Sequence, residues 1–579
     1  MRNLVLILLV FCSTRAISQI TIDGFFDDWS SAENILTFDD SNSDSNGTEL
    51  EEISITNDAG YLYIRIKLDE EVDLVDEDDL ASIRIFLDID NDPTTGYPSS
   101  NVIGSEFGID FQNRQIYNDV DYPEFYTMSF YELGVVPMPT ITSNEFEVMI
   151  ERDQFEDEIA ILVKEHFSGD VIPNQGLTLA YQFHDNYTNL PNISLAKAPE
   201  VDIRLLAYNL QHNLFDYEDE FARIINALDP DIISFSEASE VSQSQMLNYF
   251  ADYIDYPEWY TAKNGDVMAV SKYPITQSWS VSSKIGASLV NLPDSEFDSD
   301  FLTLYAHPPC CGNDAGRQFH FDSFVNFILD IQEEGGVGQI PLNTPFTFAG
   351  DMNLVGLNEQ YQTIVNGTIS DTNQFGPGGL PDWDDTPLSD AICRITTNPS
   401  AHTWRANTNN PSVGEYPPGR LDFIFYSNSV MDLVKSFTLD AGMLTSSVLS
   451  EFGLEPGDTF YTSDHLPIIS DFILSSAVSS DILGCTYSSA TNFSPDATLD
   501  DGSCVFEECN YDAAYEDGYN QGVIDGANTS TCPGDFNGDL SVTTQDLLEF
   551  LTLNLFIGLS LKIKSVSKVS IKSSLILSF

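Results

Sequence analysis

The segment Pro230-Asp-Ile-Ile-Ser-Phe-Ser-Glu237 decides how the middle of the chain is interpreted. Its apolar run is short and ends on an acid, which is typical of a buried strand with a polar group at its tip. The run Leu205-Leu-Ala-Tyr-Asn209 precedes it and has the same form. Between the two runs, apolar residues recur at helical spacing, namely Phe221, Ile224, Ile225 and Leu228. Strands that alternate with helices predict an α/β domain, which we place at residues 200–475.

The later apolar runs of this domain also end on polar residues or begin just after them. His307 follows Leu302–Ala306, and Asp351 follows Phe346–Gly350. Because ligands of open α/β sheets collect at strand ends, we expect these tips to meet in one cleft. The complete set is Asn209, Glu237, His307, Asp351, Asn353, Asp422, Asp464 and His465.

The residue types in this set point to one kind of chemistry. Carboxylate and amide oxygens are the ligands that Mg²⁺ prefers, and Mg²⁺ leaves room for phosphate oxygens. A histidine beside an aspartate can act as a base on water, and a second histidine can donate to a developing phosphoryl charge. The sequence has no Gly-rich phosphate loop, no Gly-x-Ser-x-Gly turn and no His-Glu-x-x-His helix. Taken singly, each residue also fits a turn or a solvated surface, so the prediction rests on their common order.

That order resembles the endonuclease/exonuclease/phosphatase superfamily, which includes pancreatic-type deoxyribonucleases, bacterial sphingomyelinases and inositol-phosphate 5-phosphatases. The similar segments cover about 270 residues, and their combination is highly specific although no single segment is. They are Leu206–Asn209, Pro230–Glu237, Val270–Ile275, Ala306-His307, Ala349–Asn353, His402–Trp404 with Gly419–Asp422, and Ser463–His465.

The resemblance implies a four-layer α/β sandwich, in which two packed mixed sheets are flanked by helices and Mg²⁺ or Mn²⁺ binds in the cleft. It implies that Glu237 holds the metal with help from Asn209 and Asp464. His465 would be the general base or the group nearest the phosphate, oriented by Asp422. Asp351 would position or deprotonate the water, and the phosphate oxygens would be bound by Asn353 and His307. The implied reaction is attack of water on a phosphodiester or phosphomonoester.

The composition limits how a substrate is held. The 579 residues include 23 Lys+Arg and 91 Asp+Glu, a formal net charge of −68. The 42% hydrophobic and 12% aromatic residues exclude wholesale disorder, and the strongly negative charge excludes a basic nucleic-acid clamp. We expect an extracellular nuclease on DNA or RNA. The alternatives are a sphingomyelinase- or inositol-phosphatase-like enzyme on lipid or sugar phosphates, and an inactive surface adhesion protein.

The N-terminal part predicts export and a second domain. Residues 1–18 combine a positive start, an apolar run and small residues, as in a secretory signal peptide, and no other stretch is long enough to span a membrane. Residues 20–198 alternate polar and apolar side chains, which predicts an antiparallel β-sandwich. Ile22–Trp29 and Phe86–Tyr97 resemble a family-9-like carbohydrate-binding module, which implies stacking of aromatics on sugars and calcium at Asp88, Asp90 and Asp92. Alternatively, Trp29 and Phe86 fill the core and the acids are solvated.

The C-terminal part carries small modules. Residues 481–532 resemble a Cys-rich repeat of secreted surface proteins, with Cys485–Cys504 and Cys509–Cys532 as expected pairs. A further bridge from Cys310 or Cys311 to Cys393 would brace the cleft rim. Residues 533–556 resemble half of a dockerin or EF-hand-like calcium loop, although an Asp-rich linker is the alternative. Its oxygen ligands would be Asp535, Asn537, Asp539, Ser541, Thr543 and Asp546. The tail, residues 557–579, has four Lys and no acidic residue, unlike the acid-rich remainder of the chain, which suggests a frameshift.

Overall fold

The computed structural model describes residues 19–474 apart from short gaps at 41–46, 77–80, 101, 175–176, 186, 188–189, 334–335 and 339. It also describes 483–484, 492, 494 and 499–500. The chain divides into two units, Met1–Val478 and Ser479–Phe579. In the second unit the backbone forms the short parallel pair β27 (Leu483–Gly484) and β28 (Leu499–Asp500). The expected signal peptide, the calcium ligands from Asp535 to Asp546, the pairs Cys485–Cys504 and Cys509–Cys532, and the tail lie outside the described residues.

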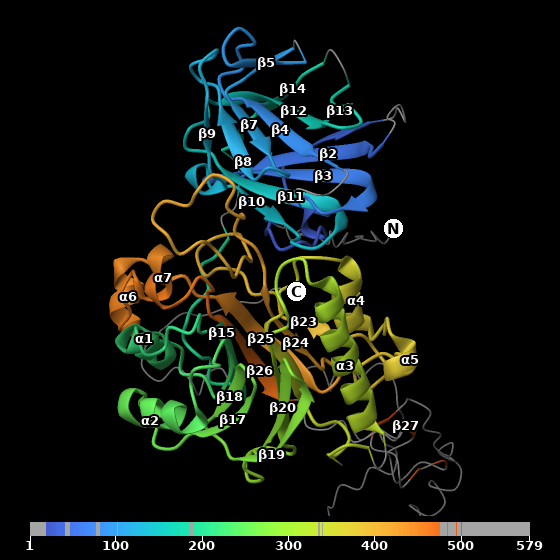
Figure 1. Ribbon diagram of the computed structural model, residues 1–579, viewed down its shortest axis with the longest axis vertical. Coiled ribbons are helices and arrows are strands. Elements are labelled where there is room, and N and C mark those ends of the chain that lie inside the picture. Colours follow the sequence, from blue (N-terminus) through green and yellow to red (C-terminus); the bar gives the residue numbers. More distant parts are fainter. Residues whose placement is uncertain are drawn as a thin grey trace, which may run out of the picture. The chain divides into compact units, whose positions relative to one another are not determined.

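The N-terminal part of the first unit contains two larger antiparallel sheets (Figure 1). The five-stranded sheet has the order β1 (Leu36–Asp39), β2 (Leu50–Asn57), β3 (Tyr61–Val72), β11 (Ser143–Glu151), β10 (Val136–Met138). The seven-stranded sheet has the order β13 (Val171–Ile172), β12 (Glu158–Glu165), β4 (Ile83–Asp88), β7 (Phe107–Asp110), β8 (Gln115–Asn118), β9 (Tyr126–Met128), and β14 (Leu179–Gln182) also pairs with β12. Smaller elements are η1 (Asp28–Ser30), η2 (Phe130–Glu132), β5 (Tyr97–Ser99) and β6 (Ile103–Ser105).

These sheets form because their sequences alternate. In β3, Leu62, Ile64, Ile66 and Leu68 are fully buried, whereas Arg65 and Lys67 between them are partly exposed. Since successive strand residues point to opposite faces, the apolar set meets the apolar set of the other sheet in one core cluster. Trp29 is only 2% exposed and packs in a second cluster with Tyr63 and Met138. This residue therefore fills the core, which is the alternative that the sequence left open.

The α/β part of the first unit has two six-stranded mixed sheets. The first sheet has the order β17 (Tyr260–Asn264), β18 (Val267–Ser271), β16 (Ile232–Ser236), β15 (Ile203–Asn209), β26 (Ile468–Leu474), β25 (Met431–Thr438). The second has the order β19 (Ile275–Ser282), β20 (Ile285–Val290), β21 (Phe301–Ala306), β22 (Phe346–Asp351), β24 (Asp422–Tyr426), β23 (Ser389–Asp390). The prediction of a β-rich chain with several sheets is confirmed.

Helices cover the outer faces of these two sheets (Figure 1). One core cluster joins the first sheet to α1 (Glu218–Leu228), α2 (Gln243–Tyr253), η3 (Ala441–Met443) and α6 (Ser446–Phe452), and α7 (Asp458–Thr462) packs on α1. Another joins the second sheet to α3 (Asp314–Gln332), α4 (Asn358–Asn366) and α5 (Thr372–Phe375). A third cluster lies between the sheets and includes Leu205, Ala349 and Ile424. The hydroxyl of Ser234 donates across this layer to the Ala349 carbonyl at 2.9 Å.

Strand direction brings the polar tips together. Strands β15 and β16 are parallel, and so are β21 and β22, so their last residues lie at one edge. Strand β24 is antiparallel to β22, which places its first residue, Asp422, opposite Asp351. Strand β26 is antiparallel to β15, so the residues just before it arrive at the same edge. Residues at the ends of some strands and at the starts of others thus lie together in one site.

Main-chain and hydroxyl hydrogen bonds join the N-terminal part of the first unit to its α/β part. Ile22 pairs with Ser400 in a parallel bridge, with its N–H donating to the Pro399 carbonyl at 2.7 Å. The Thr140 hydroxyl donates to the Leu354 carbonyl at 2.7 Å, and the Tyr131 hydroxyl accepts from the Ala406 N–H at 2.9 Å. Among the described residues, none of the helices has the length and apolar character to cross a bilayer.

The expected bridge from Cys310 or Cys311 to Cys393 is wrong. All three cysteines are free, and Cys310 and Cys311 are exposed. Cys393 is 2% exposed and lies in the cluster between the sheets, where its thiol donates to the Ala391 carbonyl at 3.1 Å. The sequence did not show that the Cys393 side chain points into the core between the sheets, away from Cys310 and Cys311.

Candidate active site

Asp351 is the residue around which the site is built. It ends β22, is 1% exposed, and its Oδ1 accepts the Asn353 N–H at 3.0 Å. Its Oδ2 accepts from Asn209 Nδ2 at 3.0 Å and faces two imidazole Nε2 atoms, at 3.5 Å from His307 and 3.6 Å from His465. Burial and the charge of Asp422 raise the pKa of Asp351, although both histidines oppose that shift.

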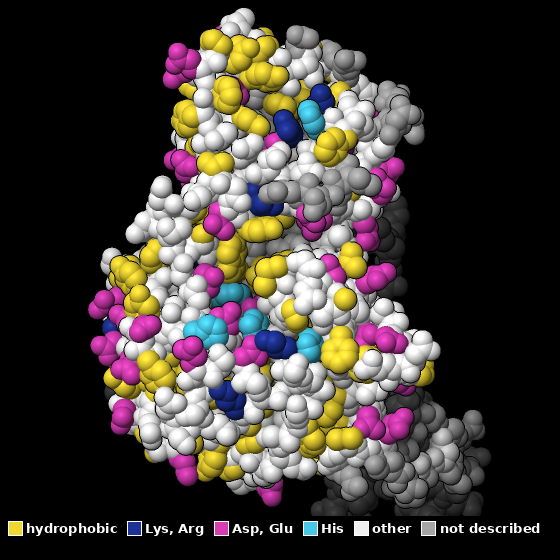
Figure 2. All heavy atoms as spheres, in the orientation of Figure 1, with side chains coloured by type: hydrophobic (Ala, Val, Ile, Leu, Met, Phe, Trp, Pro, Cys, Tyr) yellow, Lys and Arg dark blue, Asp and Glu magenta, His cyan; other side chains and the backbone are white. Residues whose placement is uncertain are grey.

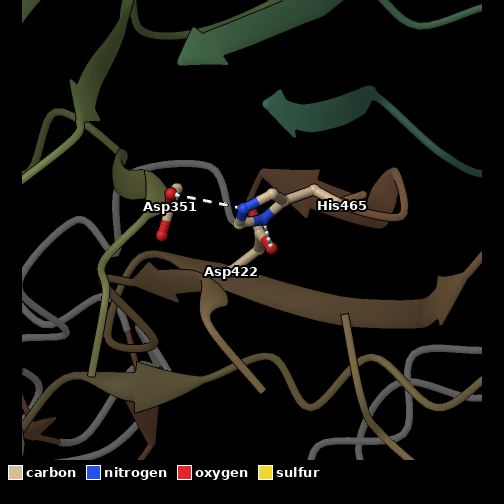
Figure 3. A group of neighbouring side chains, drawn as sticks. All are labelled: Asp351, Asp422 and His465. Atoms are coloured by element: carbon tan, nitrogen blue, oxygen red, sulfur yellow. Dashed lines mark hydrogen bonds and ion pairs between the residues drawn. The ribbon is translucent and has the colours of Figure 1, made fainter. Parts of the chain in front are cut away.

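His465 is held by the first residue of β24. Its Nδ1 lies 2.7 Å from Asp422 Oδ2, and its Nε2 points to Asp351 (Figure 3). Burial alone would lower the pKa of His465, but the charges of Asp422 and Asp351 and the hydrogen bond with Asp422 raise it to about 10. The Thr403 hydroxyl accepts the Asp422 N–H at 2.9 Å. This arrangement fixes one imidazole with Nδ1 engaged and Nε2 directed into the site.

His307 is held in the same way from the other side. Its Nδ1 lies 2.9 Å from Asp266 Oδ2, and Lys284 Nζ lies 2.5 Å from the same oxygen. Burial acts to raise the pKa of Asp266, but the hydrogen bonds with His307 and Lys284 outweigh it and lower the pKa to about 2. Burial likewise acts to lower the pKa of His307, but the hydrogen bond with Asp266 and the charges of Asp351 and Glu237 raise it. The pKa of both histidines is therefore raised, and that of His465 lies far enough above 7 to favour the protonated form at neutral pH.

Glycine at position 350 allows the close strand packing that places Asp351. Gly350 has φ +140°, and a Cβ there would lie 2.3 Å from the Ala306 carbonyl oxygen. Such a contact is too short for any side chain, so strand β22 can approach β21 only with glycine here. The packing aligns Asp351 with His307, which directly follows Ala306.

The two amides and Glu237 complete the cluster. Asn209 is fully buried at the end of β15, and Asn353 Nδ2 donates to the Pro308 carbonyl at 3.0 Å. Glu237 directly follows β16 with φ +53°, and its Oε1 lies 3.8 Å from His307 Nε2. A positive φ in a non-glycine residue is uncommon and clusters at functional sites. Histidine and acidic side chains gather on the face of this domain that Figure 2 shows.

The oxygen-rich donor set fits a hard divalent cation. Atoms of Asp351, Asp422 and His465 lie within 4.8 Å of one another, and the two carboxylates are the hard ligands among them, because the protonated form that His465 favours does not bind a metal. The Asp422 Oδ1 atom is buried and has no hydrogen-bond partner. The Asp464 carboxylate instead accepts from Trp404 Nε1 at 3.1 Å and acts on His465 through its charge. The structure thus brings together His307, Asp351, Asn353, Asp422, His465, Asn209 and Glu237, and Asp464 lies beside them.

Three residues near the cluster were not predicted. Asp266 and Lys284 orient His307, and His212 Nε2 lies 3.4 Å from Glu237 Oε2. Asp266 stands in Asn264-Gly265-Asp266, which reads as an ordinary hairpin turn. His212 follows the Asn209 tip by three residues, and a histidine so close to a predicted ligand was the one available signal.

The acids of the N-terminal sheets differ from the expected calcium set. Asp88, Asp90 and Glu106 bring ligand oxygens within 4.8 Å of one another. The Asp92 carboxylate instead accepts from the Thr94 N–H and hydroxyl at 3.0 and 2.7 Å. Glu106 comes from the junction of β6 and β7, a contribution that only the folded sheet reveals.

Comparison with known proteins places the domain in a family. Residues 206–465 match the model of the Endonuclease/Exonuclease/phosphatase family. No curated protein matches the chain. Similar solved structures include D. rerio TDP2 complexed with single-strand DNA product, at 16% identity, 47% of this chain, 98% of that chain and a TM-score of 0.30. A double mutant of beta toxin from Staphylococcus aureus with bound magnesium ions gives 16%, 47%, 99% and 0.27, and sphingomyelinase C from Streptomyces griseocarneus gives 16%, 46%, 98% and 0.26.

The segment that matches this family model, residues 206–465, contains all seven clustered side chains.

Proposed function

We propose that the protein is an exported, divalent-metal-dependent phosphoesterase that hydrolyses phosphodiester bonds, and that its substrate is nucleic acid. One observation carries the activity: two aspartate–histidine pairs point their Nε2 atoms at the same oxygen of Asp351, at 3.5 and 3.6 Å. The export rests on the composition of residues 1–18.

The side chains suit transfer of a phosphoryl group to water. The Nε2 atoms of His307 and His465, protonated, donate toward phosphate oxygens, because Asp266 and Asp422 engage each Nδ1. The Asp351 carboxylate, between them, orients the attacking water and accepts its proton. A divalent cation held by Glu237, Asn209 and Asp464, the ligands implied by the resemblance, would neutralise the phosphate charge.

The test uses the full chain with Mg²⁺ or Mn²⁺, and with a chelator as the metal-free arm. The substrates are plasmid DNA, RNA, sphingomyelin and a chromogenic diester. We expect nicking of DNA that requires the metal and falls at least about a hundredfold in His465→Ala. His184→Ala, two residues after β14 in the N-terminal part, is the matched control and keeps full activity. No turnover on any substrate overturns the phosphoesterase, and turnover of sphingomyelin alone overturns the nuclease.

We also propose that the N-terminal sheets bind a carbohydrate at the cell surface. The support is a set of exposed aromatic side chains near β5, β8 and β9. Figure 2 shows hydrophobic side chains gathered at the end of the sheets that carries β5. The set is Tyr97, Tyr122, Phe125 and Tyr126, which are 43–62% exposed. Pull-down on insoluble polysaccharides tests it, with Phe125→Ala and Tyr126→Ala expected to release the protein.

A structural Ca²⁺ at Asp88, Asp90 and Glu106 is the last part of the proposal. The Glu106 Oε1 atom is buried without a hydrogen-bond partner, and burial raises the pKa of this carboxyl to about 7. A bound cation would offset that cost. Thermal unfolding with and without Ca²⁺ tests it: a rise in Tm that Glu106→Gln removes supports the site, and an unchanged Tm in the unmodified chain overturns it.

A further inference from the structure

The loop that follows His307 carries two adjacent cysteines with no role in the proposed reaction. It reads Pro308-Pro-Cys-Cys-Gly312, and both thiols are exposed and unpaired. The other cysteine of the described residues, Cys393, is enclosed between the sheets. Within the described part of the chain, Cys310 and Cys311 have only each other as disulfide partners.

The two thiols lie close together and close to the site. The pKa of Cys310 is raised to about 11 by partial burial, by a hydrogen bond with the Cys311 side chain, and by the charges of Cys311 and Asp351. Cys310 and Cys311 are adjacent in the chain and follow His307 by three and four residues, so the pair lies on the loop beside the site. Cys311 has φ +62°, a left-handed conformation that costs a non-glycine residue energy unless its surroundings hold it.

A buried arginine holds the loop in this conformation. Arg317 is fully buried on α3, and its Nη1 donates to the Pro309 and Cys311 carbonyls at 3.1 and 2.5 Å. On the other side, Asn353 Nδ2 donates to the Pro308 carbonyl. The backbone around the cysteine pair is thus held by Arg317 at the Pro309 and Cys311 carbonyls and by Asn353 at the Pro308 carbonyl, one residue after His307.

We propose that Cys310 and Cys311 form a reversible redox site, in which a disulfide between the adjacent cysteines remodels the loop and lowers turnover at the neighbouring site. The activity part rests on the proposed function. Adjacent Cα atoms are about 3.8 Å apart, shorter than the usual ~4.4–6.8 Å of a disulfide. The bond is therefore strained and easily reduced, as in regulatory rather than structural disulfides. Its closure changes the backbone between the two residues, so the Cys311 carbonyl loses its geometry on Arg317.

The oxidant is a low-molecular-weight disulfide such as oxidised glutathione. The exposed Cys311 thiolate attacks one sulfur of the oxidant, and the first reduced thiol leaves. The Cys310 thiolate then attacks the Cys311 sulfur of the mixed disulfide and expels the second reduced thiol. The protein loses two electrons and two protons, and the oxidant becomes two thiols, so the exchange balances.

The experiment equilibrates the full chain in glutathione buffers of graded potential, alkylates free thiols and determines the mass of the peptide that contains residues 310–311. We expect an unalkylated peptide that is about 2 Da lighter under oxidising conditions, the loss of two hydrogens. Full recovery with dithiothreitol is also expected. Alkylation of both thiols at every potential, a lasting glutathione adduct, or pairing of either cysteine with another part of the chain each overturns the proposal.

Activity is measured on the same samples. We expect oxidation to lower kcat roughly tenfold or more, since small displacements near reacting groups are costly. Cys311→Ser keeps the reduced-state activity and no longer responds to oxidation, and Cys393→Ser responds like the unmodified chain. An oxidised peptide with unchanged kcat overturns the regulatory part. An oxidised peptide in a chain inactive in both states overturns the proposed function and leaves the redox site standing.

Discussion

Two carboxylates, one in each half of the first unit, are buried to the same degree but have different partners. Glu147 of β11 is 0% exposed, and Asp351 of β22 is 1% exposed. Glu147 accepts the Asp23 and Gly24 N–H groups and Trp29 Nε1, at 2.7, 2.8 and 2.9 Å. Asp351 faces two histidines and two asparagines. Burial raises the pKa of both, so burial alone does not mark a functional acid; what distinguishes Asp351 is its pair of histidine partners.

Asp351→Asn tests this contrast with the largest effect. The change keeps the shape but removes the charge between His307 and His465, and we expect DNA hydrolysis to fall by about 10³-fold or more. Glu147→Gln is the matched change in the other half and keeps kcat/KM within about twofold. Comparable losses in both variants, measured under conditions where both are folded, would contradict the distinction.

Asp266→Asn sharpens the comparison within the active site. Asp266 touches His307 and not the reacting atoms, so it is a positioning residue, and we expect a loss of roughly 10–100-fold. The charge of Asp266 also raises the pKa of His307. Its removal therefore moves the basic limb of the pH–rate profile to lower pH, which a merely structural role would not do. Asp294→Asn, at an exposed turn of the same domain, is the control.

Glu147→Gln should act on stability rather than on turnover. The amide nitrogen of glutamine must face an N–H donor that the carboxylate accepted, which leaves a buried donor unpaired and costs roughly 1–3 kcal/mol. Differential scanning calorimetry measures the lower Tm. Glu51→Gln, exposed on β2, leaves Tm unchanged. A Glu147→Gln chain as stable as the unmodified one would show that this acid is dispensable.

Asp23→Asn gives an effect on stability whose size depends on pH. Burial raises the pKa of Asp23 from 3.8 to about 7. The folded chain therefore binds a proton that the unfolded chain has lost between about pH 4 and 7, so this group makes stability fall as pH rises through that window. Asp23→Asn should stabilise the chain by roughly 1–3 kcal/mol at pH 8 and hardly at all at pH 4. Equal gains at both pH values would refute the assignment, and Asp27→Asn is the exposed control.

The strand-tip residues could be predicted from the sequence, but the residues that orient them or join their clusters could not. Asn209, Glu237, Asp351 and Asp422 end or begin apolar runs, so their positions follow from strand boundaries. Asp266 could not be found this way, because its turn is normal hairpin chemistry and its contact with His307 spans two strands of different sheets. Glu106 was missed for the same reason, since the acid cluster of the N-terminal sheets draws on separate strand ends.

The pairing of Ile22 with Ser400 has a consequence for any attempt to dissect the molecule. Residue 22 lies beside the segment that leads into Thr403, whose hydroxyl accepts the Asp422 N–H. A truncated chain that starts near residue 200 would leave that edge without its main-chain partner, and the Arg420 carbonyl would lose its bond from Thr140. Excision is therefore a perturbation of the active site, and a cut chain whose two pieces stay associated is the better model of a minimal enzyme.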